Sequence, residues 1–459
     1  MPNSTLPDAV AALAGEFLSI AMASGDFAEF ERGSVEAGFA AIRGAMSMAL
    51  EALDDELAAT ARPEGCAVHD RKERTLLTEV GQVTFSRRAW RTAGGRQFCL
   101  LDLEMSLPAR RRLSPGAFAM VRDDALCGSY QNAADVLCRH CATKVDRATV
   151  MAVVREAAEQ AAEADAAAVE SLFGDGVAPA GGRAARELCV EADGTWVALQ
   201  RDGRRKVEVK AVTAYAGKEE RGGRTRRAAP VHSATVGAPA AAWMEAVARI
   251  GSVYDLGSVE TVHLGSDGER WCKAGGAFFP GCEVVGHLDR WHLFEAVRRG
   301  LGRERGAEAA RAIGMLDGGD VAGALAFLGG LDDPDGKVAE LRSYVAGNST
   351  IIGVAGPSLG TIECDNATVC KSRMAGRRSW SREGASAMAR LLSLKASAMP
   401  VPGQRGARRE RVWEIPSGMR ASEVVQSVGS GYEPPAGHLN QNCTHDHEFI
   451  DWAVNGNWR

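Results

Sequence analysis

Long hydrophobic runs are absent from this sequence of 459 residues. No apolar stretch approaches the roughly 20 residues that a helix needs to cross a bilayer, so the sequence predicts no membrane-spanning segment and no membrane partner. The first residues lack a basic cluster and include Asp8 and Glu16, which argues against a secretory signal. We therefore expect a cytoplasmic protein.

Paired cysteine motifs are also scarce. The eleven cysteines stand at irregular intervals, which is typical of reduced thiols rather than of a disulfide framework. Cys138 and Cys141 form half of a zinc motif without a second Cys-x-x-Cys pair, and Cys443, His445 and His447 form another candidate cluster near the C-terminus. A GxxxxGK[ST] loop is missing, which argues against an intrinsic ATPase.

The composition is that of a globular protein, with 46% hydrophobic and 25% charged residues. The net charge of −5 conceals an uneven distribution. Residues 1–60 carry ten acidic and two basic side chains, whereas residues 201–230 and 371–410 each carry ten basic side chains against four and two acidic ones. Such basic blocks are either solvated surface or local binding sites for a polyanion.

The chain divides by pattern into four regions. Residues 1–113 combine two acidic amphipathic helices, over residues 9–60, with a hairpin signature in residues 72–103. Residues 114–173 predict three further helices, which begin at Ser114-Pro115, Ser129 and Asp146. A Gly- and Ala-rich linker separates them from a mixed α/β region at residues 186–397, and residues 398–459 form a C-terminal tail.

The α/β region begins with three adjoining strands. These are expected at residues 187–193, 205–217 and 230–237, followed by a helix at 238–250 and by two more strands at 259–267 and 282–289. Three adjoining strands, a helix and a further strand predict a mixed sheet with helical cover. Residues 291–346 are helical in pattern throughout.

Three acidic residues occupy positions suited to metal chemistry. Asp193 and Asp267 are each expected to end a strand and are each followed by Gly, which allows a sharp turn. Glu363 is expected on a helix. Two strand-end aspartates and a helix-borne glutamate form the oxygen-rich site that Mg²⁺ or Mn²⁺ prefers, although a single Asp-Gly pair is more often a simple turn.

The order of several long motifs resembles the ISLre-type bacterial insertion-sequence transposases, which are similar to the Mutator-type DDE transposases. The motifs are "EADGTWV", "VEVKAVTAYAGKE", "HLGSDGERWCKAGGAFFPGCEVVGHLDRWHLFEAV" and "RMAGRRSWSREGASAMARL". A preceding block, "DRKERTLLTEVGQVTFSRRAWRTAGG" to "SYQNAADVL", resembles the same family, so the resemblance covers roughly residues 65 to 395.

The resemblance implies a ribonuclease-H-like catalytic domain whose three acids correspond to Asp193, Asp267 and Glu363. It also implies a helical insertion at about residues 295–346. Mutator relatives carry Cys-x-x-His where this chain has Asp289-x-x-His292. Asp289 is either an auxiliary metal ligand, a partner that holds His292, or a helix cap, and it is the rival of Asp267 for the role of second catalytic acid.

Candidate DNA contacts come from three regions. Residues 129–158 have helix-turn-helix spacing, with Arg147 and Thr149 at the start of the second helix. A basic hairpin and the segment beyond Glu363 supply the other candidates, which are Arg87, Arg88, Arg91, Lys371, Arg373, Arg377 and Arg378. A generic helical hairpin or a solvated surface would have the same pattern.

The sequence therefore favours a Mg²⁺-dependent DDE transposase that binds double-stranded terminal repeats and target DNA, acts as a homo-oligomer and associates with the nucleoid. Two alternatives remain open at this stage. One is a non-catalytic DNA-binding protein derived from a transposase, and the other is a nuclease on the same sheet.

Overall fold

The computed structural model describes residues 6–141 and 145–405. They form two compact units, one that ends at Arg112 and one from Leu113 to Arg405. No helix in these ranges is long and apolar enough to cross a membrane. The candidate zinc cluster at Cys443, His445 and His447 lies outside the described residues.

The first unit contains the two predicted acidic helices and the predicted hairpin. Asp26 caps the second helix by accepting a hydrogen bond from the Glu29 amide. The hairpin strands pair antiparallel up to Thr78 and Gly81, and Gly81 has a φ of 111°, which a glycine adopts without strain. One face of the hairpin is buried with residues of the neighbouring helices. The elements are α1 (Leu6–Ala23), α2 (Phe27–Thr60), β1 (Cys66–Thr78), β2 (Gly81–Thr92), β3 (Gln97–Phe98) and α3 (Leu100–Glu104).

The second unit begins with the three predicted helices. Ser114 and Asp146 cap two of them through hydrogen bonds from the amides of Ala117 and Thr149. The helices are α4 (Pro115–Cys127), α5 (Tyr130–Cys141) and α6 (Arg147–Val169), which continues into a π-helical turn, η1 (Glu170–Gly174).

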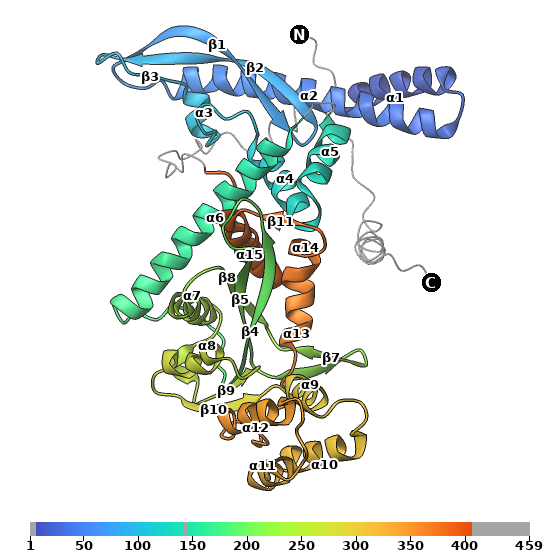
Figure 1. Cartoon of the computed structure of the whole chain (residues 1–459). Coiled ribbons are helices and arrows are strands. Elements are labelled where there is room, and N and C mark those ends of the chain that lie inside the picture. Colours follow the sequence, from blue (N-terminus) through green and yellow to red (C-terminus); the bar gives the residue numbers. More distant parts are fainter. Residues whose placement is uncertain (1–5, 142–144, 406–459) are drawn as a thin grey trace. The chain divides into compact units, whose positions relative to one another are not determined.

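A six-stranded mixed sheet forms the centre of the second unit (Figure 1). The strand order is β10-β9-β4-β5-β8, and β11 pairs with the end of β4. β5 is antiparallel to β4 and β8, whereas β9 and β10 are parallel to β4. The predicted mixed sheet is thus confirmed. Its strands are β4 (Glu187–Leu199), β5 (Lys206–Tyr215), β8 (Val231–Thr235), β9 (Thr261–Ser266), β10 (Glu283–Leu288) and β11 (Ser379–Trp380).

Strand β4 is longer than predicted, and Asp193 lies in its middle rather than at its end. Gly194 does not turn the chain; it pairs with Lys210 of β5, and a Cβ atom there would lie 2.3 Å from Glu208 Oε1. Thr195, Trp196 and Val197 are residue types that strands favour, which is why the strand continues beyond Gly194. The prediction that Asp-Gly marks the strand end was wrong here.

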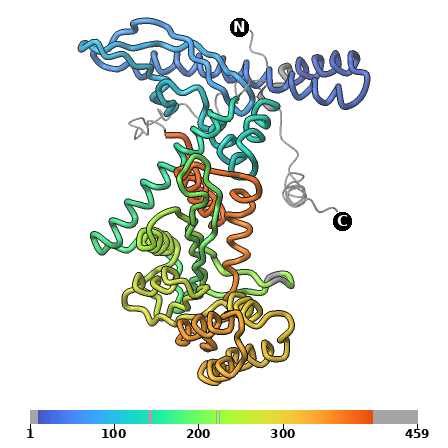
Figure 2. The backbone as a smooth tube through the Cα atoms, in the orientation of Figure 1, coloured from blue at the N-terminus to red at the C-terminus, as the bar shows by residue number. Residues whose placement is uncertain are grey.

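The two faces of the sheet differ in chemistry. Leu188, Val190 and Ala192 of β4 face an apolar core that Trp243 and Ile250 of α7 complete. Their neighbours in sequence face the opposite side, where the segment of residues 362–374 runs alongside the strands (Figure 2). The elements that link and cover the strands are β6 (Lys218–Arg221), β7 (Arg224–Arg227), α7 (Pro239–Gly251), η2 (Leu256–Ser258), α8 (Arg270–Lys273), η3 (Ala274–Phe278), α13 (Ile362–Asp365), η4 (Asn366–Lys371), α14 (Ser372–Met374) and α15 (Arg382–Ala396).

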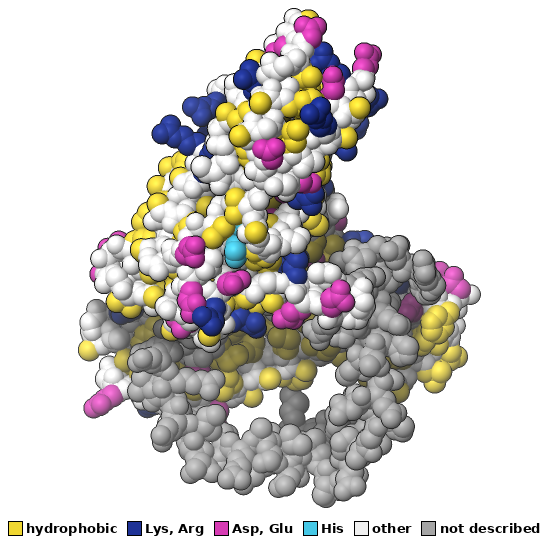
Figure 3. Space-filling model, turned by 90° about the horizontal axis from the view of Figure 1, so that it is seen from below, with side chains coloured by type: hydrophobic (Ala, Val, Ile, Leu, Met, Phe, Trp, Pro, Cys, Tyr) yellow, Lys and Arg dark blue, Asp and Glu magenta, His cyan; other side chains and the backbone are white. Residues whose placement is uncertain are grey.

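Four helices separate β10 from the segment that carries Glu363. They enclose a small apolar core of their own, which includes Val297, Leu316, Leu328 and Val345. On the face that Figure 3 shows, acidic and basic side chains are interspersed with hydrophobic ones. The helices are α9 (Arg290–Leu301), α10 (Gly306–Asp317), α11 (Val321–Gly329) and α12 (Lys337–Gly347).

A buried ionic network joins α6 to the sheet's covering helices. Asp165 of α6 accepts hydrogen bonds from Arg249 of α7, at 2.7 and 2.9 Å, and from Arg390 of α15, at 2.8 Å. Glu245 also accepts one from Arg390. Because both arginines are buried, removing the Asp165 carboxylate would leave two buried charges short of a partner. The helices of residues 114–173 therefore belong to the same compact unit as the sheet.

Candidate metal site

Asp193 is the most buried of the predicted catalytic acids. Its carboxylate accepts a hydrogen bond from the Gly194 amide at 2.7 Å and another from the side-chain amide of Asn366. Burial raises the pKa of Asp193 to about 6, and the nearby charges of Asp267 and Glu363 act in the same direction. A cation beside these carboxylates would relieve their repulsion.

Asp267 follows β9 in a true turn. Gly268 has a φ of 95°, and the Asp267 carboxylate accepts a hydrogen bond from the Glu269 amide at 2.8 Å. The hydroxyl of Tyr344 on α12 donates to the Asp267 carbonyl at 2.8 Å. The helices of the insertion therefore help to hold this turn beside the sheet.

Glu363 lies on α13, as predicted, and the start of that helix is anchored by Glu191. The buried Glu191 carboxylate accepts hydrogen bonds from the backbone amides of Gly360, Thr361 and Ile362. Glu191 lies two residues before Asp193 on β4, and residues two apart on a strand share a face. A single strand thus carries one acid of the site and the anchor for another.

His292 connects Asp289 to the acidic cluster. Its Nδ1 lies 3.0 Å from Asp289 Oδ1, and its Nε2 lies 3.4 Å from Glu363 Oε1. Burial lowers the pKa of His292, but the hydrogen bond to Asp289 and the charges of Asp289, Asp193 and Asp267 raise it overall. The Asp289 carboxylate also accepts the His292 amide at 3.0 Å, so Asp289 both caps α9 and holds the imidazole.

The donor atoms fit a divalent cation. Asp193, Asp267 and His292 each offer one ligand atom, and these atoms all lie within 4.8 Å of one another. The Asp289–His292 pair has the arrangement that orients a metal-binding imidazole, with one ring nitrogen on a carboxylate and the other toward the site. Asn366 Oδ1 is buried and has no hydrogen-bond partner among the described residues, which leaves one more oxygen beside Asp193.

The predicted basic hairpin is arranged differently from expectation. Arg87 is paired with Asp102, and Arg88 with Asp54 and Asp55, while Trp90 is buried in the core. These arginines hold α2 and α3 to the hairpin, because an acidic helix packs directly against them. Arg91 is exposed and remains a candidate for contact with DNA.

The predicted contacts beyond Glu363 also differ from one another. Lys371 Nζ lies 3.6 Å from Glu363 Oε2, so this cation belongs to the acidic cluster. Arg373 is buried and donates to the Ala125 carbonyl, which makes it a structural residue. Arg377 is exposed, and Arg378 donates to the Arg373 carbonyl at the end of α14.

The predicted helix-turn-helix contacts lie at the start of α6. The Thr149 amide is held by the Asp146 cap, and the Arg147 side chain is exposed. The buried face of α6, which includes Val150, Val153 and Val154, packs within the second unit.

Three supporting residues were missed by sequence reasoning. Glu191 could have been found as a charged residue within the buried strand "ELCVEAD", because a buried carboxylate requires several hydrogen-bond donors. Asn366 lies three residues after Glu363 and hence on the same helical face. Tyr344 gave no signal, because its contact with Asp267 depends on how the insertion folds back.

Comparison with known proteins gives a family without an assigned activity. The model of the uncharacterised protein family UPF0236 matches residues 25–346, a range that includes Asp193, Asp267, Asp289 and His292. A protein of Streptococcus gallolyticus named "UPF0236 protein in vanSb 3'region" is 25% identical over 271 residues. This match covers 57% of the present chain and 56% of the relative, so it spans little more than half of either protein.

Proposed function

The chain belongs to the UPF0236 family, and on that premise we propose that it is a DDE transposase of a bacterial insertion sequence, which cuts and joins DNA with divalent cations. The observation that carries the proposal is the convergence of Asp193, Asp267 and Glu363 with His292 at one face of the mixed sheet. These residues are far apart in the chain: Asp193 lies on β4, Asp267 directly follows the neighbouring strand β9, and Glu363 lies on α13.

The strand arrangement supports the same proposal. Three antiparallel strands, β8, β5 and β4, are followed across the sheet by two that are parallel to β4. The first strand of this sheet carries Asp193 and the fourth is followed by Asp267, which is compatible with the ribonuclease-H-like domain that the resemblance implies. The four helices between β10 and α13 occupy the position of the expected insertion.

Each residue of the cluster has a definite task in this proposal. Asp193, Asp267 and His292 would hold Mg²⁺ or Mn²⁺, which when bound supplies Lewis acidity at a scissile phosphate. Asn366 orients the Asp193 carboxylate, and Asp289 fixes the orientation of the His292 ring. Glu363, which lies beside His292, would supply a third carboxylate to the metal site. Lys371, which lies beside Glu363, would offer a positive charge to a phosphate oxygen.

The test is DNA cleavage and strand transfer by the purified full-length protein. The substrate is a plasmid that carries the DNA flanking the gene, with Mg²⁺, Mn²⁺ or EDTA present. We expect nicks or breaks at defined ends with either metal and none with EDTA. Asp193→Asn, Asp267→Asn and Glu363→Gln should abolish cleavage, whereas Glu260→Gln, which alters an exposed ion pair with Arg186, should leave it unchanged.

The variants also separate Asp267 from its rival. Asp289 contacts the cluster through His292, and losing such an indirect partner typically costs about 10- to 100-fold. Asp289→Asn should therefore remain measurably active while Asp267→Asn is inactive. The reverse result would assign the second acid to Asp289. Binding without cleavage would favour the non-catalytic alternative, and cleavage without strand transfer would favour a nuclease.

A further inference from the structure

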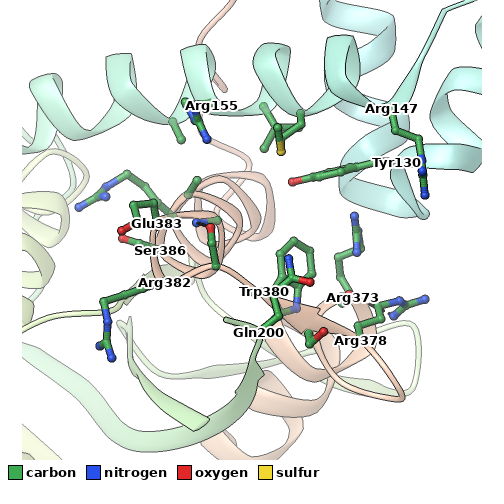
Figure 4. Close-up of a pocket in the computed structure, with 18 of the residues that line it drawn as sticks. Tyr130, Arg147, Arg155, Gln200, Arg373, Arg378, Trp380, Arg382, Glu383 and Ser386 are labelled. Carbon is green, nitrogen blue, oxygen red and sulfur yellow. Dashed lines mark hydrogen bonds between the residues drawn. The ribbon is translucent and has the colours of Figure 1, made fainter. Parts of the chain in front are cut away.

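A basic groove lies in the second unit between α6 and the segment that contains β11 and the start of α15 (Figure 4). Its volume is about 1040 Å³. Glu159 and Glu383 are its acidic lining residues. Against these two stand six arginines, which are Arg147, Arg155, Arg373, Arg378, Arg382 and Arg390.

Most of this positive charge is not neutralised by neighbouring carboxylates. Arg390 is paired with Asp165 and Glu245, and Arg382 with the exposed Asp202 at 3.3 Å. Arg373 and Arg378 donate to backbone carbonyls, and no carboxylate among the described residues pairs with them. Such a surplus of fixed charge attracts a polyanion.

Arg147 and Arg155 are the accessible cations that α6 contributes to the groove. Both are exposed, and neither has a hydrogen-bond or ion-pair partner among the described residues. They are eight residues apart on α6 with the exposed Met151 between them, so they lie on one face at about 12 Å spacing. This distance corresponds to roughly three or four nucleotides along a strand, at about 3.4 Å each.

Two aromatic residues, the half-buried Tyr130 and the buried Trp380, pack against Arg373 on the side of the groove opposite α6. The guanidinium of Arg373 contacts the rings of both Tyr130 and Trp380, at 5.4 and 5.0 Å from their centroids. Trp380 in turn donates to the Met374 carbonyl at 2.9 Å. The side of the groove opposite α6, which includes Arg373 and Trp380, is therefore held in place by side-chain packing.

The groove is connected to the acidic cluster by one continuous helical segment. Glu363 lies near the start of residues 362–374, and Arg373 lies at their end. Ten residues of helix span on the order of 15 Å. A nucleic acid that reaches the cluster with one phosphate would present phosphates some four or five nucleotides away to the groove.

We propose that this groove binds the sugar-phosphate backbone of the nucleic acid whose scissile phosphate occupies the acidic cluster. The inference rests on the proposed function and extends it by naming where the flanking strand is held. Guanidinium groups suit this ligand because they bind phosphate oxygens through two parallel hydrogen bonds. Arg147 and Arg155 would make the principal contacts.

The experiment compares two double variants of the full-length protein. Arg147→Gln/Arg155→Gln removes the accessible cations of the groove, and Arg303→Gln/Arg311→Gln removes two exposed cations from the helical insertion. The probe is a short fluorescein-labelled DNA duplex of arbitrary sequence, whose binding is followed by fluorescence anisotropy in EDTA over a series of salt concentrations. Circular dichroism checks that both variants are folded.

We expect the groove variant to bind at least about tenfold more weakly at moderate salt, and to lower the slope of log affinity against log salt by about two. The control variant should bind within about twofold of the wild type. A photocrosslinking residue, p-benzoylphenylalanine, in place of Met151 should attach to the probe, whereas the same residue at Arg303 should not.

Equal binding by the two double variants, or no crosslink from position 151, would overturn the groove assignment. A greater loss of affinity for poly-glutamate than for DNA would instead assign the groove to an acidic protein segment. Mn²⁺ binding by the acidic cluster, measured by calorimetry, is independent of these results. A wild-type protein that binds Mn²⁺ but no DNA at any salt concentration would contradict the proposed function itself.

Discussion

The carboxylate of Glu191 accepts hydrogen bonds from both the backbone amide and the hydroxyl of Thr361, at 2.8 and 2.7 Å. This contact joins the central strand β4 to the first turn of the helix that carries Glu363. A carboxylate at a helix N-terminus also interacts favourably with the helix dipole. The position of Glu363 relative to Asp193 therefore depends on a residue that belongs to neither the metal cluster nor the helix.

Replacing Glu191 with Leu should destabilise the protein strongly. Leucine offers no acceptor to the three backbone amides that donate to Glu191, and each unsatisfied buried group costs about 1–3 kcal/mol. We expect the free energy of unfolding to fall by about 2–4 kcal/mol in urea titrations. Tyr215→Phe, which removes one donor to the same carboxylate, should cost only about 1 kcal/mol. Equal losses would show that Glu191 does not anchor α13.

Asp193 should make stability depend on pH in a definite direction. Its pKa is raised to about 6 from an ordinary value of 3.8, so the folded state binds the proton more tightly than the unfolded state. The contribution of Asp193 to the free energy of unfolding is therefore largest below pH 4, and it decreases as the pH rises toward 6. In EDTA, Asp193→Asn should match the wild type near pH 4 and exceed it by about 2–3 kcal/mol above pH 6.5.

The matched control for this prediction is Glu260→Gln. The hydrogen bond from Arg186 lowers the pKa of Glu260, so replacing Glu260 should change the pH dependence of stability in the opposite direction. A stability difference for Asp193→Asn that does not change between pH 4 and pH 7 would contradict the assignment of a raised pKa.

Metal affinity should depend on His292 and on the residue that holds it. Calorimetric titration with Mn²⁺ at pH 7.5 should show that His292→Ala binds far more weakly than the wild type, since a direct ligand is lost. Asp289→Asn should weaken binding by about 10- to 100-fold, since the imidazole loses its orienting partner. His69→Ala, an exposed histidine on β1, is the control and should bind as the wild type does. Identical titrations for His69→Ala and His292→Ala would exclude His292 from the site.

Arg88 should matter for stability, and Arg91 should not. Arg88→Met leaves the Asp54 side chain, which is only 1% exposed, without its ionic partner, and breaking such a pair costs about 3–5 kcal/mol. Arg91→Met changes an exposed side chain and should alter the free energy of unfolding by less than about 0.5 kcal/mol. Denaturation curves of the two variants that superimpose would refute the structural role of Arg88.

Sequence patterns predicted correctly those helices, strands and turns that are determined by residues close together in the chain. The helix starts at Ser114 and Asp146, the strand β5 and the turn at Gly268 each depend on neighbouring residues, and each was confirmed. The β6–β7 hairpin was missed, because its charged residues lack the apolar alternation of a strand. The end of β4 was also misjudged, because the Asp-Gly pair at Asp193 lies opposite β5, where glycine serves close packing rather than a turn.

The order of residues along the chain specifies which chemical groups are available: three separated acids, an Asp289-x-x-His292 pair and two blocks rich in arginine. Which of these residues meet depends on how distant segments pack in the folded chain. Strand order brings Asp193 beside Asp267, Glu191 anchors the helix of Glu363, and the return of the chain at α15 sets Arg382 across a groove from Arg147. In the folded chain Arg87, Arg88 and Arg373 make structural contacts, because a buried charge requires a partner within the fold. The spacing of residues in the sequence does not identify that partner.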